Sequence, residues 1–247
     1  MLTIVGPGRI GRALARLAAD QDVDARLLGR GEPIEDGAGP IVVCTRADDV
    51  AAVIDVCPRP DDLVFLQNGA LFPWLRERGL GDCTQGQLWL AVPSIDATPQ
   101  AGAESVLVGR HAPGLAYLLC RAGLPARVLS GPEVFPDEVA AKLLWLSVFG
   151  VLGDLHRETV LASVARRDDV GALVAELVPV CAAGLGSALA VDATVARLCA
   201  YSLAVGSWRA GVKEWRWRDG WLQATARSHA LATPLHDAAC ARLGVPG

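Results

Sequence analysis

The chain has 247 residues, of which 52% are hydrophobic and 20% are charged. This composition is typical of a folded globular protein with a sizeable core, and it excludes a disordered chain. The formal net charge of −4 provides no broad positive field, so we expect no nucleic-acid partner. The cysteines number seven and form no C-x-x-C pair, which argues against a disulfide framework and against a cysteine-rich zinc site.

The amino-terminal residues MLTIVGPG contain neither a basic segment nor the apolar stretch of a secretory signal, so we expect a cytoplasmic protein. The most apolar later segment covers residues 139–155 and includes Lys142 and Asp154. It is short for a bilayer span and carries two charges, which favours a buried helix and no membrane partner.

Short β-like runs alternate with helical patterns in the first half of the chain. Strands are predicted over 2–5, 25–28, 41–44 and 63–66, with helices over 10–20, 47–56 and 72–78. Further strands are predicted near 87–91, 105–108 and 126–129, where prolines divide the chain into short pieces. Alternation of this kind predicts a mostly parallel sheet covered by helices.

The pattern changes near residue 132, beyond which almost no strand signal remains. Helices are predicted over 137–155, 169–190, 193–204, 212–230 and 234–243. We therefore predict an α/β protein with a Rossmann-type domain over 1–132 and an all-helical domain over 133–247. The helical domain is expected to bind the substrate and to offer a surface for a homodimer.

A G-x-G-x-x-G motif follows the first predicted strand and opens the first predicted helix. Its residues are Gly6, Pro7, Gly8, Arg9, Ile10 and Gly11. In a dinucleotide-binding turn the first glycine permits the tight turn, the second lets the backbone approach the pyrophosphate, and the third lets helix and strand pack closely. The alternative is an ordinary glycine-rich turn, which the surrounding β/α alternation disfavours.

The end of the second predicted strand bears on the choice of cofactor. Arg30 stands where an NADP enzyme tolerates the 2′-phosphate, although Glu32 could fill the acidic role of an NAD enzyme. Beyond the third strand, Thr45 and Arg46 follow, and Arg46 is either a second phosphate contact or a solvated loop arginine. We therefore expect NADP(H) as the cofactor.

Four stretches resemble the ketopantoate reductase (2-dehydropantoate 2-reductase) family in that family's order. They are GPGRIG with the following LLGRGE, LVFLQNG at 63–69, EVAAKLLWLSVFG at 138–150 and KEWRWRDGWLQATARSHALATP at 213–234. The resemblance implies a Rossmann domain followed by a helical domain like the carboxyl-terminal domain of 6-phosphogluconate dehydrogenase. It also implies NADPH-dependent reduction of a small keto acid.

The resemblance assigns roles by position. Lys142 corresponds to the catalytic lysine that protonates the ketone oxygen, and Glu214 to a carboxylate that orients substrate and lysine. Asn68 corresponds to an asparagine at the junction of cofactor and substrate, and Ser202 to a serine that binds the substrate carboxylate. The resemblance gives the NADP 2′-phosphate to Arg30 and Arg46.

Three positions depart from the family pattern. Leu146 and Gly150 stand where the family has substrate-binding asparagines, and Cys199 stands where it often has another. Each change removes a polar anchor worth about 1 to 3 kcal/mol, so ketopantoate itself is not the expected substrate.

Lys142 is a candidate functional residue independently of the family resemblance, because Lys142 and Lys213 are the only lysines in the sequence. A buried ammonium has a lowered pKa that suits a proton donor near neutrality, whereas the alternative is a lysine that extends from the helix to water. On one straight helix Ser202 and Glu214 would lie about 18 Å apart, so we expect a break near Gly206 and Gly211.

Two functions remain open at this point. The first is an NADP-dependent oxidoreductase with Lys142 as general acid, and the second is a nucleotide-binding or sensing protein of the same fold without catalysis. The histidines at 111, 156, 229 and 236 show no metal-ligand spacing, so we expect no metal site.

Overall fold

The computed structural model describes residues 1–245 and divides the chain into two compact units. The first unit consists of Met1–Gln67 and Trp74–Phe135, and the second of Asn68–Pro73 and the chain from Pro136 onward. The segment Asn68–Pro73 thus belongs with the second unit, although the sequence analysis placed it inside the first domain.

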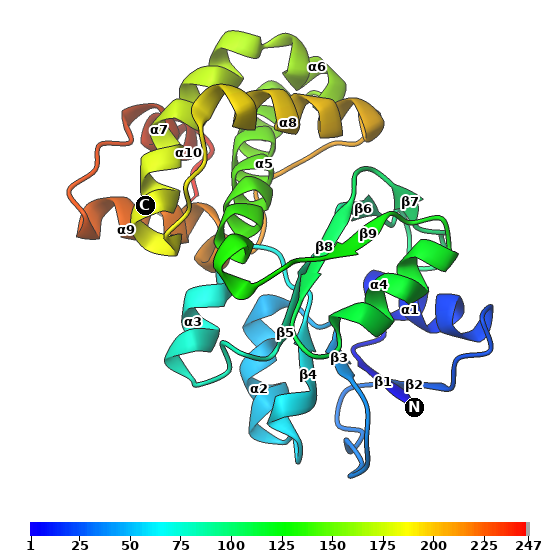
Figure 1. The fold of residues 1–247 in the computed structure, drawn as a ribbon. Coiled ribbons are helices and arrows are strands. Elements are labelled where there is room, and N and C mark those ends of the chain that lie inside the picture. Colours follow the sequence, from blue (N-terminus) through cyan, green and yellow to red (C-terminus); the bar gives the residue numbers. More distant parts are fainter. Residues whose placement is uncertain (246–247) are drawn as a thin grey trace. The chain divides into compact units, whose positions relative to one another are not determined.

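A seven-stranded sheet forms the centre of the first unit (Figure 1). Its strands, in spatial order, are β2 (Ala25–Leu28), β1 (Leu2–Val5), β3 (Ile41–Val43), β4 (Leu63–Phe65), β5 (Thr84–Gln87), β8 (Ser105–Val108) and β9 (Ala126–Val128). All neighbours are parallel except β5 and β8, which confirms the mostly parallel sheet. The predicted strand over 87–91 is divided, because β6 (Leu90–Ala91) pairs with β7 (Gln100–Ala101) in a separate antiparallel ribbon.

Two helices cover one face of this sheet, α1 (Arg9–Ala19) and α4 (Ala112–Arg121). Figure 1 shows α2 (Val50–Asp55) across the sheet from them. Helix α4 was not predicted from the sequence, because prolines flank and enter this segment. Pro113 lies in the first turn of α4, where a missing N–H removes no intrahelical hydrogen bond.

The second unit is helical, as expected from the fold class. Its helices are α5 (Phe135–His156), α6 (Val160–Ala165), α7 (Arg167–Leu185), α8 (Val191–Ala204), α9 (Asp219–Ser228) and α10 (Pro234–Arg242); α3 (Leu71–Glu77) lies earlier in the chain. The prediction of one helix over 212–230 is wrong in its first part, because α9 begins only at Asp219. A 3-10 turn, Trp215–Trp217, precedes it.

Helix α5 is buried on all sides. Between Glu138 and Gly153 no residue is exposed, and only Leu146 is half-buried. Among the described residues it is the one helix long and apolar enough to cross a membrane, but 78% of its apolar stretch is buried inside the protein. Its burial agrees with the core helix expected from the sequence.

The segment between α8 and the 3-10 turn crosses α5 at two glycines. A Cβ atom on Gly153 would lie 2.6 Å from the carbonyl oxygen of Ala210, and one on Gly150 would lie 3.2 Å from that of Gly211. The helix break expected after Ser202 is therefore present, since α8 ends at Ala204. Gly150 serves this close approach, because a larger side chain would displace the segment.

Candidate functional site

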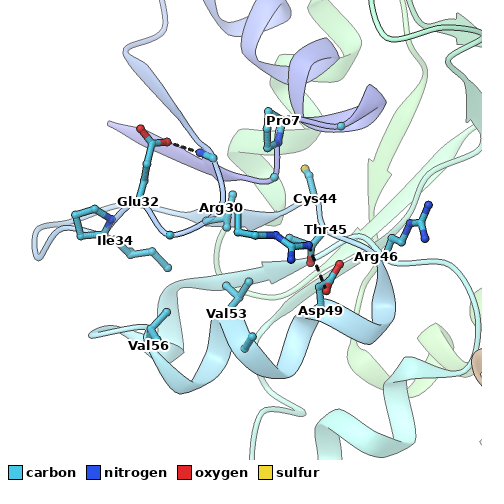
Figure 2. Close-up of a pocket in the computed structure, with 17 residues that line it drawn as sticks. Pro7, Arg30, Glu32, Ile34, Cys44, Thr45, Arg46, Asp49, Val53 and Val56 are labelled. Carbon is cyan, nitrogen blue, oxygen red and sulfur yellow. Dashed lines mark hydrogen bonds and ion pairs between the residues drawn. The ribbon is translucent and has the colours of Figure 1, made fainter.

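A pocket of about 740 Å³ lies in the first unit at the carboxyl ends of β1, β2 and β3 (Figure 2). The strand order reverses at β1, because β2 and β3 lie on its opposite sides. Such a switch point is where open α/β sheets bind their ligands. The sequence-predicted residues that line the pocket are Gly6, Pro7, Gly8, Arg30, Thr45 and Arg46.

The first and third glycines of the motif are required by the protein's own packing. Gly6 has a φ of +105°, and a Cβ there would lie 3.0 Å from the backbone carbon of Cys44. A Cβ on Gly11 would overlap the carbonyl oxygen of Gly6, so α1 can approach β1 only through glycine. These two positions therefore have the structural roles expected from the motif.

Gly8 differs from the other two glycines of the motif, Gly6 and Gly11. Its φ of −75° and ψ of −171° suit any residue, and within the described chain the nearest atom to a Cβ there is the Cys44 carbonyl oxygen at 4.0 Å. Neither strain nor packing in the described protein explains a glycine at this position. Gly8 is also the N-cap of α1, which has no side-chain cap, so the first-turn N–H groups are available to an anion.

Opposite charges meet at the mouth of this pocket. Arg30 is 93% exposed, and its guanidinium lies 3.9 Å from the Asp49 carboxylate (Figure 2). Glu32 accepts a hydrogen bond from the Gly29 backbone N–H, so its carboxylate already has a partner in its own loop. Arg30 is therefore an exposed cation at the pocket mouth, and Asp49 is its ion-pair partner.

Three further residues predicted to bind the cofactor, Arg9, Ile10 and Arg46, direct their side chains elsewhere than toward Arg30. Arg9 donates a hydrogen bond to the Val92 carbonyl at 3.3 Å, and Ile10 packs against the hydrophobic core. Arg46 lines the pocket, but Figure 2 shows its guanidinium directed away from Arg30. Gln67 was not predicted from the sequence; its amide donates to the carbonyls of Val43 and Thr45 and so fixes the end of β3.

Lys142 lies in the second unit, 3% exposed, on the buried helix α5. Its ammonium is 5.1 Å from the centre of the Trp145 ring and 4.8 Å from that of Tyr201. Burial, together with the charges of Arg218 and Arg197, lowers the pKa of Lys142 to about 7. The alternative of a lysine that extends to water does not apply, because the side chain is buried, and its charged and neutral forms are both populated near neutral pH.

The other two predicted residues of this region have partners of their own. Ser202 is fully buried and accepts a hydrogen bond from the Trp145 indole at 2.9 Å. Glu214, with a φ of 48°, forms an ion pair with the nearly buried Arg218. Ser202 therefore supports the aromatic wall beside Lys142, and Glu214 holds a cation that lowers the pKa of Lys142.

Asn68 belongs to the short segment that joins the second unit. The next residue, Gly69, has a φ of +93°, and its Cβ would lie 2.5 Å from the Trp217 carbonyl oxygen. That carbonyl accepts a hydrogen bond from the Ala70 N–H at 2.7 Å. Asn68 is thereby held next to the turn that carries Glu214 and Arg218, and its side chain is half-buried.

No family model and no curated protein sequence matches the chain. Solved structures match it over nearly its full length. They include 2-dehydropantoate 2-reductase from Methylococcus capsulatus, with a TM-score of 0.75 at 16% identity, covering 98% of this chain and 95% of that one. The corresponding enzyme from Geobacter metallireducens GS-15 gives 0.74 at 18% identity, covering 97% of both chains.

A further similar structure is the ternary complex of D-mandelate dehydrogenase with NADH and anilino(oxo)acetate. Its TM-score is 0.77 at 13% identity, and the match covers 97% of this chain and 96% of that one. At these identities the likeness shows the fold, which this chain shares with ketopantoate reductases.

The burial of Lys142 predicts a dependence of stability on pH. Its pKa falls from 10.5 to about 7 on folding, so between these values the unfolded chain binds more protons and stability rises with pH. Lys142→Met should therefore stabilise the protein at neutral pH by roughly 1 to 4 kcal/mol, and the gain should shrink as the pH approaches 10.5. Denaturant unfolding at several pH values measures this, with the exposed Lys213→Met as control. A gain that stays constant with pH would contradict the burial of a titrating ammonium.

Proposed function

We propose that the protein is an NADP(H)-dependent oxidoreductase that reduces the carbonyl group of a small 2-oxo acid. The observation that carries the proposal is a buried lysine of pKa about 7 in a chain that also has a dinucleotide-type pocket. Perturbed lysines of this kind are typical of general acids. The fold shared with reductases of 2-oxo acids and with a 2-hydroxy acid dehydrogenase supports the same reaction class.

The first unit would hold the dinucleotide. The uncapped N-terminus of α1 and the open space at Gly8 suit a pyrophosphate, and Arg30 suits a 2′-phosphate. When bound, the cofactor supplies the hydride. The structurally similar D-mandelate dehydrogenase was solved with NADH, so the preference for NADP rests on the pocket arginines, above all Arg30, and on the family resemblance.

Lys142 would complete the reaction as the proton donor. As hydride reaches the carbonyl carbon, the π bond breaks and its electron pair moves to oxygen, which takes a proton from the Lys142 ammonium. The products are a hydroxy acid and a neutral lysine, which regains its proton from solvent. A pKa about 7 allows both protonation states at neutral pH, which arginine could not provide.

The substrate class follows from the polarity around Lys142. Trp145 and Tyr201 form an aromatic surface beside the ammonium, and Leu146 is apolar where the resembling family has an asparagine. Gly150 is covered by the backbone of residue 211. These features favour a 2-oxo acid with an apolar or aromatic side chain over hydroxylated ketopantoate.

Gly8 provides the first test. Gly8→Val should abolish dinucleotide binding while the unfolding free energy changes little, because only the ligand requires the space at this position. Gly11→Ala is the matched control and should instead destabilise the fold, because its Cβ meets the Gly6 carbonyl. Fluorescence titration with NADPH measures binding. Normal NADPH affinity in the Val variant would refute the pocket.

The cofactor preference is tested with the charges at the pocket mouth. Arg30→Ala should weaken NADPH binding by about 10- to 100-fold and leave NADH binding nearly unchanged. Asp49→Asn should instead tighten NADPH binding, because it removes the carboxylate that pairs with Arg30 and would compete with the 2′-phosphate. Arg127→Ala, an exposed arginine on β9, controls for the loss of charge. Equal effects on both dinucleotides would remove Arg30 from the phosphate site.

Lys142 separates the enzyme from a non-catalytic nucleotide-binding protein. Lys142→Arg should lower kcat for any accepted 2-oxo acid by about 10² to 10⁴ and leave NADPH affinity unchanged, whereas Lys213→Arg should be neutral. In the wild type, reduction should slow as the pH rises through about 7, because the donor loses its proton. Full activity in the Lys142→Arg variant would contradict proton donation. NADPH binding without turnover of any 2-oxo acid would favour the sensing protein.

A further inference from the structure

Four polar side chains come together inside the second unit. Ser147 lies on α5, Asp219 begins α9, and His236 and Cys240 lie one turn apart on α10. Each of the four residues is at most 1% exposed. Burial of this kind is costly for a carboxylate unless a cation or several donors compensate it.

The distances within this cluster are those of a metal site. Nε2 of His236 lies 3.0 Å from Oδ1 of Asp219 and 3.6 Å from Sγ of Cys240, and the three ligand atoms lie within 4.8 Å of one another. Around a tetrahedral zinc ion, standard bond lengths separate N and O ligands by about 3.3 Å and N and S ligands by about 3.6 Å. Shifts of a few tenths of an ångström would thus admit the ion.

Hydrogen bonds within the cluster do not satisfy the carboxylate. Asp219 Oδ1 accepts a hydrogen bond from Ser147 and forms a second one with His236 Nε2 at 3.0 Å, but Oδ2 has no hydrogen-bond partner among residues 1–245. A buried oxygen without a donor costs about 1 to 3 kcal/mol. A divalent ion bound by one carboxylate, one thiolate and one neutral imidazole would leave the cluster with no net charge.

The surrounding structure holds the ligands in place and offers a route to them. The Glu176 carboxylate accepts hydrogen bonds from the backbone N–H groups of Leu235 and His236, at 2.9 and 2.8 Å, and so fixes the first turn of α10. Cys240 also lines a cavity of about 300 Å³ together with residues of α9 and α10. The ligand set is thus positioned through the backbone of α10 and has an entry path, whereas Nδ1 of His236 has no hydrogen-bond partner among residues 1–245.

We propose that Asp219, His236 and Cys240 bind a zinc-type divalent cation, with the Ser147 hydroxyl or a water molecule as the fourth ligand. The mixture of thiolate, imidazole and carboxylate suits zinc better than magnesium or calcium. On binding, the Cys240 thiol loses its proton to solvent, and His236 coordinates through Nε2 with its remaining proton on Nδ1. The ion would join α9 to α10, and with Ser147 as the fourth ligand it would join α5 as well, a structural role independent of the proposed hydride chemistry.

Cobalt(II) provides a spectroscopic test, because it substitutes for zinc and reports thiolate ligation. The full chain, without a histidine tag and after treatment with a chelator, should bind about one Co²⁺. It should then show the thiolate-to-cobalt charge-transfer band and the strong visible bands of a tetrahedral site. Zinc should bind with the same stoichiometry by mass spectrometry and raise the melting temperature.

Matched variants assign the ligands. Cys240→Ser should remove the charge-transfer band and weaken Co²⁺ binding by about a hundredfold or more, whereas Cys181→Ser, at an equally buried free cysteine on α7, should keep both. His236→Gln should weaken binding while NADPH titration of the same variant still gives normal affinity, so failure of this site is separable from failure of the cofactor pocket. Absence of the band in the wild type, or its persistence in Cys240→Ser, would overturn the proposal.

Discussion

The second unit depends on a helix that has no exposed face between Glu138 and Gly153. Every polar group on such a helix must find its partner inside the protein, because water is excluded. Glu138 meets Arg197, and the Lys142 ammonium lies beside two aromatic rings. Ser147 meets Asp219. These buried contacts have a cost and a chemical effect. The burial that costs folding free energy also lowers the pKa of Lys142 to about 7.

Local signals in the sequence accounted for most of the fold. The glycine motif, the strand periodicity and the change of pattern near residue 132 depend on neighbours in the chain, so they could be recognised directly. The errors arise where packing overrides the local pattern. Trp215 and Trp217 lie in an amphipathic stretch that resembles a helix, but their turn is held by the Asn68–Pro73 segment. Pro113 suggested a break but lies in the first turn of α4.

The candidate sites were less predictable than the fold. Lys142 could be singled out because lysine is rare in this chain and its surroundings are apolar. The partner of Ser202 could not be predicted from the sequence, because its hydrogen bond with Trp145 joins residues 57 positions apart on two different helices. The three ligands of the proposed metal site come from two helices, α9 and α10, and the neighbouring Ser147 comes from α5. Their one local signal, a histidine and a cysteine four positions apart on α10, was outside the C-x-x-C and histidine-pair patterns that the sequence analysis considered.

The segment Asn68–Pro73 packs with the second unit, so the helical unit cannot be cut out of the chain as one continuous fragment. A fragment that begins at Pro136 would contain every long helix of that unit but would lack Gly69 and Ala70, which pack on and bond to Trp217. The surface around Trp217 would then lose its covering segment. The turn that holds Glu214 and Arg218 therefore acquires its native environment only after a contact across about 150 positions of sequence, a closure that costs entropy and slows folding. The helical unit is thus a compact body in space without being a continuous piece of the polypeptide.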